Sequence, residues 1–323
     1  MNAFPAAHVQ KFARLALLLR HNSFVGKLKG EASVRFAFFA SVQKGGLLLC
    51  KEARGGNTSS EIAVFGKEGL PLATTYPRWV ALSPQVSVLV SSTHRFNTDT
   101  VLLAWFSAPR KGEICADFGT GCGTIPLLWC AKAQAGEGAM PGKVYAVELQ
   151  ADACALALRS VERNQLENTI CIINNDINNL QYLHPPRGLD LVACNPPYKP
   201  EGTGIKNPQE GLSIARHEGA CTFAEIAAAA ARQLRWGGRF CCCLRPERLA
   251  GAMEALRRAG LEPKRLRFVQ QRPDKAPFLF LLQAARGGNP GLRVEPVLFV
   301  EDGKGHFSQE MLQIYGSYKE GHV

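Results

Sequence analysis

The sequence predicts an α/β fold in which a seven-stranded, mainly parallel sheet carries helices on both of its faces. Three observations support this: apolar runs alternate with helical patterns from about residue 113, the runs are short and continuous, and glycine or polar residues follow several of them. Continuous apolar runs are expected where both faces of a strand are buried. A chain of 323 residues with 46% hydrophobic residues can build such a core.

The elements are expected in a regular order along the chain. Val86–Val90 alternates like a strand, and a short helix over Val101–Phe106 follows, with Asp99 as its N-cap. Thr222 and Glu225 form a capping box for a later helix. The seven strands are expected over Glu113–Phe118, Lys143–Leu149, Ile170–Asn174, Leu189–Cys194, Arg239–Leu244, Leu266–Gln270 and Phe278–Ala284. The helices between them are expected over Ile125–Ala133, Asp152–Asn164, Phe223–Leu234 and Glu247–Ala259.

Two regions are predicted along the chain. Residues 1–80 form a poorly defined N-terminal extension with weak patterns, a few strands and glycine-rich breaks, and residues 81–323 form one domain. The first thirty residues contain five Lys or Arg and no acid before Glu31. This composition fits a targeting peptide, an arm that touches phosphate, or an upstream extension of the reading frame. The last two interpretations are favoured because nothing downstream needs this segment.

Charge and cysteine content suggest where the protein works. Lys and Arg number 38 against 27 Asp and Glu, a formal net charge of +11, which favours an anionic partner such as nucleic acid over a merely solvated basic surface. The 11 cysteines include no C-x-x-C pair, so buried thiols in a reducing cytoplasm are expected rather than disulfides or a metal site. No apolar stretch approaches the roughly 18 residues that a membrane span needs.

A local excess of positive charge lies near the C-terminal end of the predicted sheet. Nine basic and four acidic residues occur between Arg245 and Lys275. They form either a surface for nucleic acid or a solubilising helix face, and the sequence leaves both interpretations open.

Glycine and acidic residues follow the first three predicted strands of the parallel sheet. Gly119, Gly121 and Gly123 allow a sharp turn and a close approach of backbone to a ligand. Glu148, after the second strand, can accept hydrogen bonds from two ribose hydroxyls, and Asp176, after the third, from an adenine amine. Ligands bind at this edge of open parallel sheets. Alternatively, Glu148 is simply exposed at a strand end and Asp176 caps a turn.

This arrangement resembles the class I S-adenosylmethionine-dependent methyltransferases over about residues 86–284. The resemblance implies their Rossmann-like fold and S-adenosylmethionine as the cofactor. It also implies that Asp117 helps to hold the amino-acid end of the donor, that Glu148 binds its ribose and that Asp176 binds its adenine. The glycines of the loop and Asn195 complete the implied donor site.

The fourth predicted strand is followed by Asn195, Pro196, Pro197 and Tyr198, the candidate catalytic residues. An amide or exocyclic amine is a poor nucleophile because its lone pair is delocalised. The side-chain oxygen of Asn195 and the carbonyl of Pro196 can accept its two N–H bonds, and the prolines stiffen the backbone. Tyr198 offers a stacking face, worth about 1–3 kcal/mol for a base. The alternative is a plain turn, since Asn and Pro favour turns.

This tetrad resembles one shared by adenine-N6 methyltransferases of DNA and of tRNA, guanine-N2 methyltransferases of ribosomal RNA and glutamine-N5 methyltransferases of proteins. The loop from Lys199 to Pro208 and the segment Ala215-Arg216-His217-Glu218 are similar to the bacterial tRNA1(Val) adenine-37 N6-methyltransferases. That family has small residues where Asn97 and Thr98 stand.

The second resemblance implies an enzyme that methylates an adenine of tRNA in the cytoplasm, with no membrane or metal partner. It implies contacts to the tRNA from Tyr198, Lys199, Arg216 and His217. A protein glutamine-N5 or ribosomal guanine-N2 methyltransferase, or an RNA-binding module with an inactive donor site, remain the alternatives. The sequence does not fix the oligomeric state, and a monomer is compatible with it.

Overall fold

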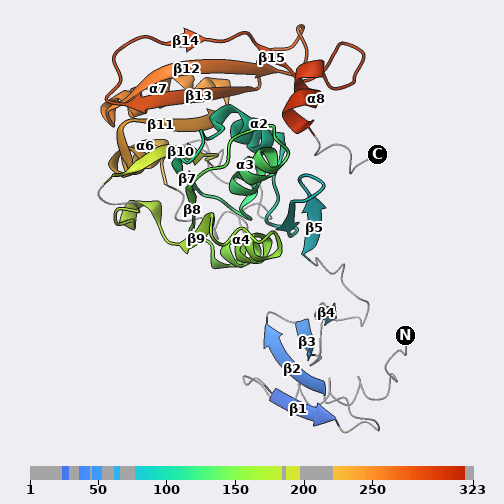
Figure 1. Cartoon of the computed structure of the whole chain (residues 1–323). Helices are drawn as coiled ribbons and strands as arrows, with labels where there is room; N and C mark the ends of the chain where they lie inside the picture. Colours follow the sequence, from blue (N-terminus) through green and yellow to red (C-terminus); the bar gives the residue numbers. More distant parts are fainter. Residues whose placement is uncertain are drawn as a thin grey trace. The chain divides into compact units, whose positions relative to one another are not determined.

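The computed structural model describes residues 77–183, 187–196 and 221–316, together with the backbone of four strands nearer the N-terminus. The chain divides into two compact units, Met1–Tyr76 and Pro77–Val323. The strands of the first unit form an antiparallel sheet in sequence order (Figure 1): β1 (Phe24–Leu28), β2 (Phe36–Gln43), β3 (Gly46–Glu52) and β4 (Ile62–Phe65).

The second unit is built on a nine-stranded sheet with the order β14-β12-β13-β11-β10-β7-β8-β9, and β15 also pairs with β12. Its central strands are parallel, whereas β13 runs antiparallel to both of its neighbours. The strands are β7 (Ile114–Phe118), β8 (Lys143–Glu148), β9 (Ile170–Asn174), β10 (Leu189–Cys194), β11 (Leu234–Leu244), β12 (Leu261–Gln270), β13 (Leu279–Arg286), β14 (Arg293–Val294) and β15 (Leu298–Phe299). The seven predicted strands are therefore present, and two short strands extend the edge.

Helices cover both faces of this sheet, as the continuous apolar runs predicted. The helices are α2 (Thr98–Ser107), α3 (Thr124–Gln134), α4 (Ala151–Arg163), α6 (Phe223–Gln233), α7 (Leu249–Arg258) and α8 (Gln309–Tyr315), with short 3-10 turns η1 (Ile177–Asn179) and η3 (Pro246–Arg248). One core joins α2, α3, α4 and α8 to one face, and a second core joins α6 and α7 to the other. Figure 1 shows α2 and α3 against the first of these faces. Neighbouring strand residues alternate between the cores: Cys115 enters the first and Ala116 the second.

Several local predictions need correction. The N-cap of α2 is Asn97, whose side chain accepts a hydrogen bond from the backbone N–H of Thr100, and Asp99 lies in the first helical turn. The predicted strand over Val86–Val90 exists as β6 (Ser87–Val90), but it pairs with β5 (Arg78–Ala81) in a separate hairpin. The Thr222–Glu225 capping box is confirmed.

The predicted burial of the cysteines is confirmed for most of those described. All ten whose side chains the structure describes are free, and eight of them are buried. Burial raises the pKa of Cys130 to about 12, so this thiol stays protonated and behaves as a small apolar side chain.

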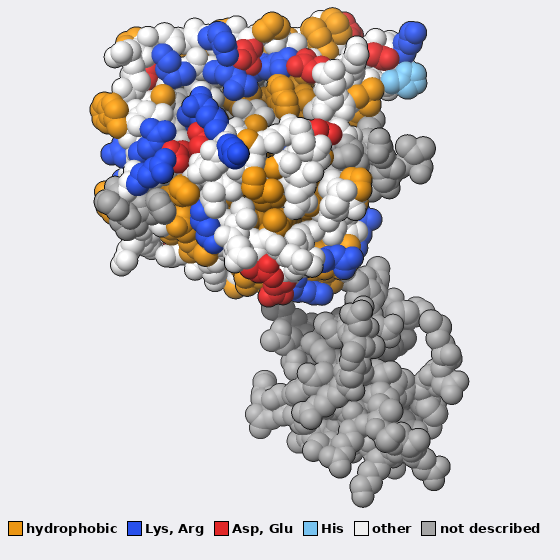
Figure 2. Space-filling view, viewed as in Figure 1, with side chains coloured by type: hydrophobic (Ala, Val, Ile, Leu, Met, Phe, Trp, Pro, Cys, Tyr) orange, Lys and Arg blue, Asp and Glu red, His pale blue; other side chains and the backbone are white. Residues whose placement is uncertain are grey.

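Five of the nine basic residues between Arg245 and Lys275 form ion pairs with carboxylates of the same unit. Figure 2 shows acidic side chains scattered among the Lys and Arg side chains over this part of the second unit. Arg265 pairs with Glu295 at 2.8 Å, and Arg267, which is 7% exposed, pairs with Glu310 at 2.8 Å. These pairs tie the C-terminal segment to β12, so these two arginines have a structural role.

Candidate functional site

The predicted site residues meet in a cleft at the carboxyl ends of the parallel strands. The cleft has a volume of about 330 Å³, within the usual range for small-molecule sites. Loops that follow β7, β8, β9 and β10 form its walls. The predicted residues that line it are Gly119, Gly121, Glu148, Asp176, Asn195 and Pro196.

The glycine loop is held against the neighbouring strand β8. The backbone N–H groups of Gly119 and Thr120 both donate to the carbonyl of Val147, at 2.9 and 3.0 Å. Gly121 has a φ of +57°, a left-handed conformation that favours glycine. Gly123 does not line the cleft. It precedes α3 with a φ of +84°, and a Cβ there would lie 3.3 Å from the Cβ of Ala157.

Asp117 lies at the base of this loop and is 1% exposed. Its Oδ2 accepts a hydrogen bond from the hydroxyl of Thr120 at 2.7 Å, whereas Oδ1 has no partner among the described residues. Burial raises the pKa of Asp117 to about 7, and the nearby carboxylate of Glu148 adds to this effect. An unpaired, buried carboxylate oxygen beside a ligand cleft is suited to a cationic group.

Glu148 ends β8 and is 7% exposed. Its Oε2 accepts the backbone N–H of Gly121 and its Oε1 that of Gln150, both at 2.9 Å. These two bonds fix the plane of the carboxylate at the wall of the cleft. Each oxygen has a second lone pair, so the pair can still receive the hydroxyls of a ribose.

Asp176 caps the turn η1, because its Oδ1 accepts the backbone N–H of Asn178 at 2.8 Å. The structure thus shows the capping role that was one of its two interpretations, and it also places the residue on the cleft wall. A carboxylate can carry out both roles, since its second oxygen is not used by the cap.

Sequence reasoning missed several cleft residues. Leu149 is 53% exposed directly after Glu148, and Ile177 and Ile226 also line the cleft, which gives it an apolar wall suited to a flat ring. His94 lines it as well, and its Nε2 lies 3.0 Å from a carboxylate oxygen of Asp152. The sequence did contain a signal for Leu149, because it is a hydrophobic residue directly after the acid that ends a strand.

Asn195 and Pro196 enter the cleft from the end of β10. The Nδ2 of Asn195 donates to the hydroxyl of Thr100 at 3.2 Å, and the thiol of Cys243 lies 3.2 Å from Oδ1 as its donor. Pro196 is buried. The remaining predicted acceptor and substrate residues lie outside the described residues: Pro197, Tyr198, Lys199, Arg216 and His217.

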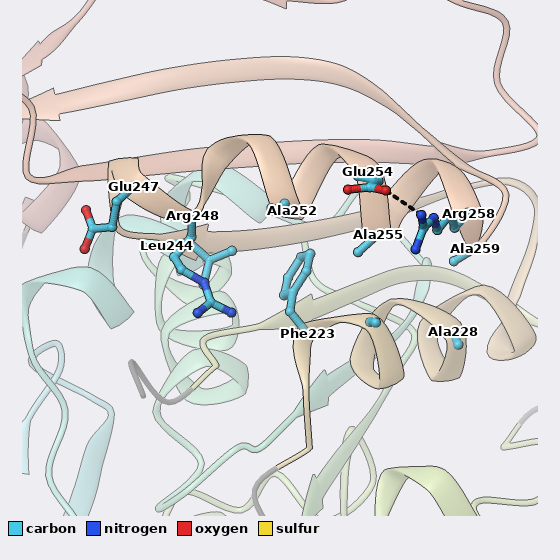
Figure 3. Close-up of a pocket in the computed structure, with 12 residues that line it drawn as sticks. Phe223, Ala228, Leu244, Glu247, Arg248, Ala252, Glu254, Ala255, Arg258 and Ala259 are labelled. Atoms are coloured by element: carbon cyan, nitrogen blue, oxygen red, sulfur yellow. Dashed lines mark ion pairs between the residues drawn. The ribbon is translucent and has the colours of Figure 1, made fainter. Parts of the chain in front are cut away.

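A larger hollow of about 540 Å³ lies between α6 and α7 (Figure 3). Alanines and the Glu254–Arg258 ion pair contribute much of its lining, and it contains no predicted site residue. Among the residues that the structure describes, no helix is long and apolar enough to cross a bilayer. Within the same residues, no group of three or more His, Cys, Asp or Glu side chains is arranged to hold a metal ion.

Comparisons with known proteins agree with this geometry. Residues 89–247 match the family described as methyltransferase small domain. The chain is 26% identical over 220 residues to a tRNA1(Val) (adenine(37)-N6)-methyltransferase of Tolumonas auensis, covering 68% of this chain and 87% of that protein. It is 27% identical to the protein of the same name from Parabacteroides distasonis, over 58% of this chain and 76% of that one.

The fold has a counterpart among solved structures. A protein described as a predicted O-methyltransferase, Atu636 from Agrobacterium tumefaciens, superimposes with a TM-score of 0.53 at 19% identity. The superposition covers 68% of this chain and 97% of that one. The sheet and its helices therefore have the class I methyltransferase arrangement.

Proposed function

We propose that this methyltransferase, whose residues 89–247 belong to the methyltransferase small domain family, transfers a methyl group to the N6 amine of an adenine in tRNA. The methyl donor proposed is S-adenosylmethionine, and the target proposed is adenine 37 of tRNA1(Val). The names of the relatives from Tolumonas auensis and Parabacteroides distasonis support this choice of substrate. We further propose that residues 81–323 carry the activity in the cytoplasm, with residues 1–80 as an extension.

One observation carries the proposal: Asn195 and Pro196 line the same cleft as Gly121 and Glu148. Residues suited to a donor and residues suited to a flat N–H group thus share one cavity. The chain can hold both reactants side by side, and such positioning can contribute about 7–11 kcal/mol to catalysis in favourable cases.

The residues of the donor half fit the proposed cofactor. Bound S-adenosylmethionine supplies a methyl group on a positively charged sulfur, which makes that methyl electrophilic. Glu148 would receive the ribose hydroxyls, and the unpaired Oδ1 of Asp117 would stabilise the donor's ammonium group. Asp176 and the apolar wall of Leu149 and Ile177 would hold the adenine.

The acceptor half would act by orientation. The side-chain oxygen of Asn195 and the carbonyl of Pro196 would each accept one N–H of the target amine. Holding both N–H bonds favours the tetrahedral nitrogen that develops as the new N–C bond forms. No strong general base is needed, because the proton is lost to water after the transfer. Tyr198, Lys199, Arg216 and His217 are proposed to contact the RNA, and a base in a loop is already unpaired.

Incubation with labelled donor and separate pools of tRNA, ribosomal RNA, DNA and release factor tests this proposal. We expect label in tRNA, and digestion should release N6-methyladenosine. Label in ribosomal guanine or in a glutamine would instead identify one of the related activities. No label in any pool, together with no donor binding by calorimetry, would indicate an RNA-binding module.

The Asn195→Ala variant tests the chemistry of the site. We expect the turnover number to fall roughly 100- to 1,000-fold, the range for losing one group that stabilises a transition state. Donor affinity should stay close to the wild-type value. Asn168→Ala, at an exposed position away from the cleft, is the matched control and should keep full activity. Full activity of Asn195→Ala would reject the proposed chemistry.

A further inference from the structure

The first turn of α2 is in contact with the amide that the proposed reaction uses. Thr100 belongs to this turn, is 9% exposed, and its hydroxyl oxygen lies 3.2 Å from Nδ2 of Asn195. Residue 100 and residue 195 are 95 positions apart, so the contact depends on the tertiary fold. Thr100 is not among the residues that line the cleft.

The hydrogen bonds of Asn97 determine what this hydroxyl can do. The Oδ1 of Asn97 accepts the backbone N–H of Thr100 at 3.2 Å, which is the N-cap bond of α2. That bond identifies the atom as the amide oxygen. The hydroxyl of Thr100 also lies 3.2 Å from it and can only donate to it, which uses the single proton of the hydroxyl.

A hydroxyl that has donated its proton can only accept a bond from Asn195. It therefore selects the orientation in which Asn195 presents its NH2 group to Thr100. The flipped amide would place its oxygen against the hydroxyl oxygen, two acceptors with no proton between them. The oxygen of Asn195 is thereby directed away from Thr100.

The other end of the amide contacts a thiol that can donate to its oxygen. The thiol of Cys243, on β11, lies 3.2 Å from Oδ1 of Asn195 and is a donor to it. A thiol is a weak donor, so its hydrogen bond to this oxygen competes only weakly with that of an amine N–H. The contact of Cys243 is thus compatible with the orientation that Thr100 selects.

We propose that Thr100, with its proton committed to Asn97, is a positioning residue that fixes the side-chain amide of Asn195 with its nitrogen toward Thr100 and its oxygen directed away from it. This inference rests on the proposed function, because it assigns Asn195 as the acceptor of that amine's N–H. The N-cap of a helix then serves the acceptor site as well as the helix. Thr100 itself does not touch the reacting atoms.

Thr100→Val tests the inference, because it keeps the shape of the side chain and removes the hydroxyl. We expect the turnover number to fall about tenfold or more, since small misplacements of a reacting group can cost up to about a hundredfold. The donor dissociation constant should stay within twofold of wild type. Thr100→Ser restores the hydroxyl and should recover most of the lost rate. Asn97→Asp keeps an acceptor oxygen at the cap and should also remain active.

Thr98→Val is the matched control. Thr98 stands in the same turn, but its hydroxyl lies 3.2 Å from the hydroxyl of Tyr315 on α8. We expect it to lower the melting temperature slightly and to leave the turnover number unchanged. A structural role for Thr100 would predict equal losses in melting temperature and donor binding for both Val variants.

The outcomes separate this inference from the proposed function. If Asn195→Ala loses activity while Thr100→Val keeps the wild-type turnover number, the positioning role is wrong and the proposed function stands. If Asn195→Ala is fully active, the proposed function fails first. If Thr100→Val does not fold, the rates of Thr100→Ser and of Asn97→Ala decide: we expect the serine variant near wild type and the alanine variant slower. Equal rates in those two variants would overturn the inference.

Discussion

Two buried aspartates stand at opposite ends of the parallel strands and differ in their partners. Asp117, near the carboxyl end of β7, is 1% exposed, and Asp190, near the amino end of β10, is 2% exposed. The carboxylate of Asp190 accepts the backbone N–H of Ile114 at 2.8 Å and Nε of Arg235 at 2.5 Å. Burial acts to raise the pKa of Asp190, but these bonds outweigh it and lower the pKa, whereas the pKa of Asp117 is raised to about 7.

Burial alone therefore does not distinguish Asp190 from Asp117. The two differ in that both oxygens of Asp190 have partners, whereas Oδ1 of Asp117 has none among the described residues. Glu113, also at the amino end, accepts the backbone N–H of Arg110 at 2.8 Å and pairs with Arg239 at 2.5 Å. The carboxylates of Asp190 and Glu113, at the amino ends of the strands, are thus paired by the protein itself. The carboxyl ends hold an oxygen of Asp117 that the described residues do not satisfy, and this is the end that holds the cleft.

Removing the paired carboxylate should have the largest effect on stability. Asp190→Ala leaves the N–H of Ile114 without its acceptor, and a buried donor left unpaired costs about 1–3 kcal/mol. We expect the free energy of unfolding to fall by that amount, as measured by urea denaturation. Donor affinity of the folded protein should be nearly unchanged, because Asp190 is at the other end of the strands. A clear loss of donor affinity in the folded Asp190→Ala variant would contradict the view that the amino ends of the strands have a structural role only.

The unpaired carboxylate should instead make donor binding depend on pH. If the ionised form of Asp117 stabilises the donor's ammonium group, protonation below pH 7 weakens binding, and affinity should fall about tenfold from pH 8 to pH 6. Calorimetry at constant ionic strength measures this. Asp117→Asn cannot ionise, so its affinity should be low and flat over the same range. A pH-independent wild type would remove Asp117 from the donor site.

The raised pKa of Asp117 also affects the stability of the protein without bound donor. Here the pH dependence is reversed, because low pH favours the folded state. The folded pKa of Asp117 is about 7 and lies above its ordinary value of 3.8, so the folded state binds the proton more tightly than the unfolded state. This contribution to stability is fully present below about pH 4 and is lost as the pH rises to 7. Asp117→Asn should reduce this part of the pH dependence in denaturation experiments.

The smallest effect on stability is expected for Arg187, the more exposed of the two arginines that pair with Asp190. Arg187 lies 3.6 Å from Asp190, but its side chain is 62% exposed. An exposed ion pair contributes about 0–1 kcal/mol. We expect Arg187→Ala to change the free energy of unfolding by less than about 0.5 kcal/mol, while Arg235→Ala should cost more. Equal losses of stability in the two variants would mean that distance and exposure do not determine how much each arginine contributes.

The strands and the cleft could be predicted from the sequence because both depend on local patterns. Apolar runs ending in glycine or acidic residues placed β7, β8 and β10 within one or two residues. Capping was harder: Asn97 and Asp99 are both good N-caps, and only the backbone conformation shows that Asn97 starts α2. The prediction of Asp99 was wrong for that reason.

Contacts between side chains far apart in sequence could not be predicted from the sequence. The basic cluster around Arg265 and Arg267 fitted an RNA surface, yet Glu295 and Glu310 neutralise these two residues from 30 and 43 positions away in sequence. The bond between Thr100 and Asn195 was missed for the same reason. Separations of this size are set by the topology of the sheet, which residue spacing alone does not give.

Among the described residues, the last helix, α8, supports α2, the first helix of the second unit. The hydroxyls of Thr98 and Tyr315 lie 3.2 Å apart although 217 positions separate them in sequence. During synthesis, α2 therefore leaves the ribosome long before its support exists. Contacts between distant segments form late in folding. We expect nascent chains that stop before Gln309 to lack full activity even though every cleft residue has already been made.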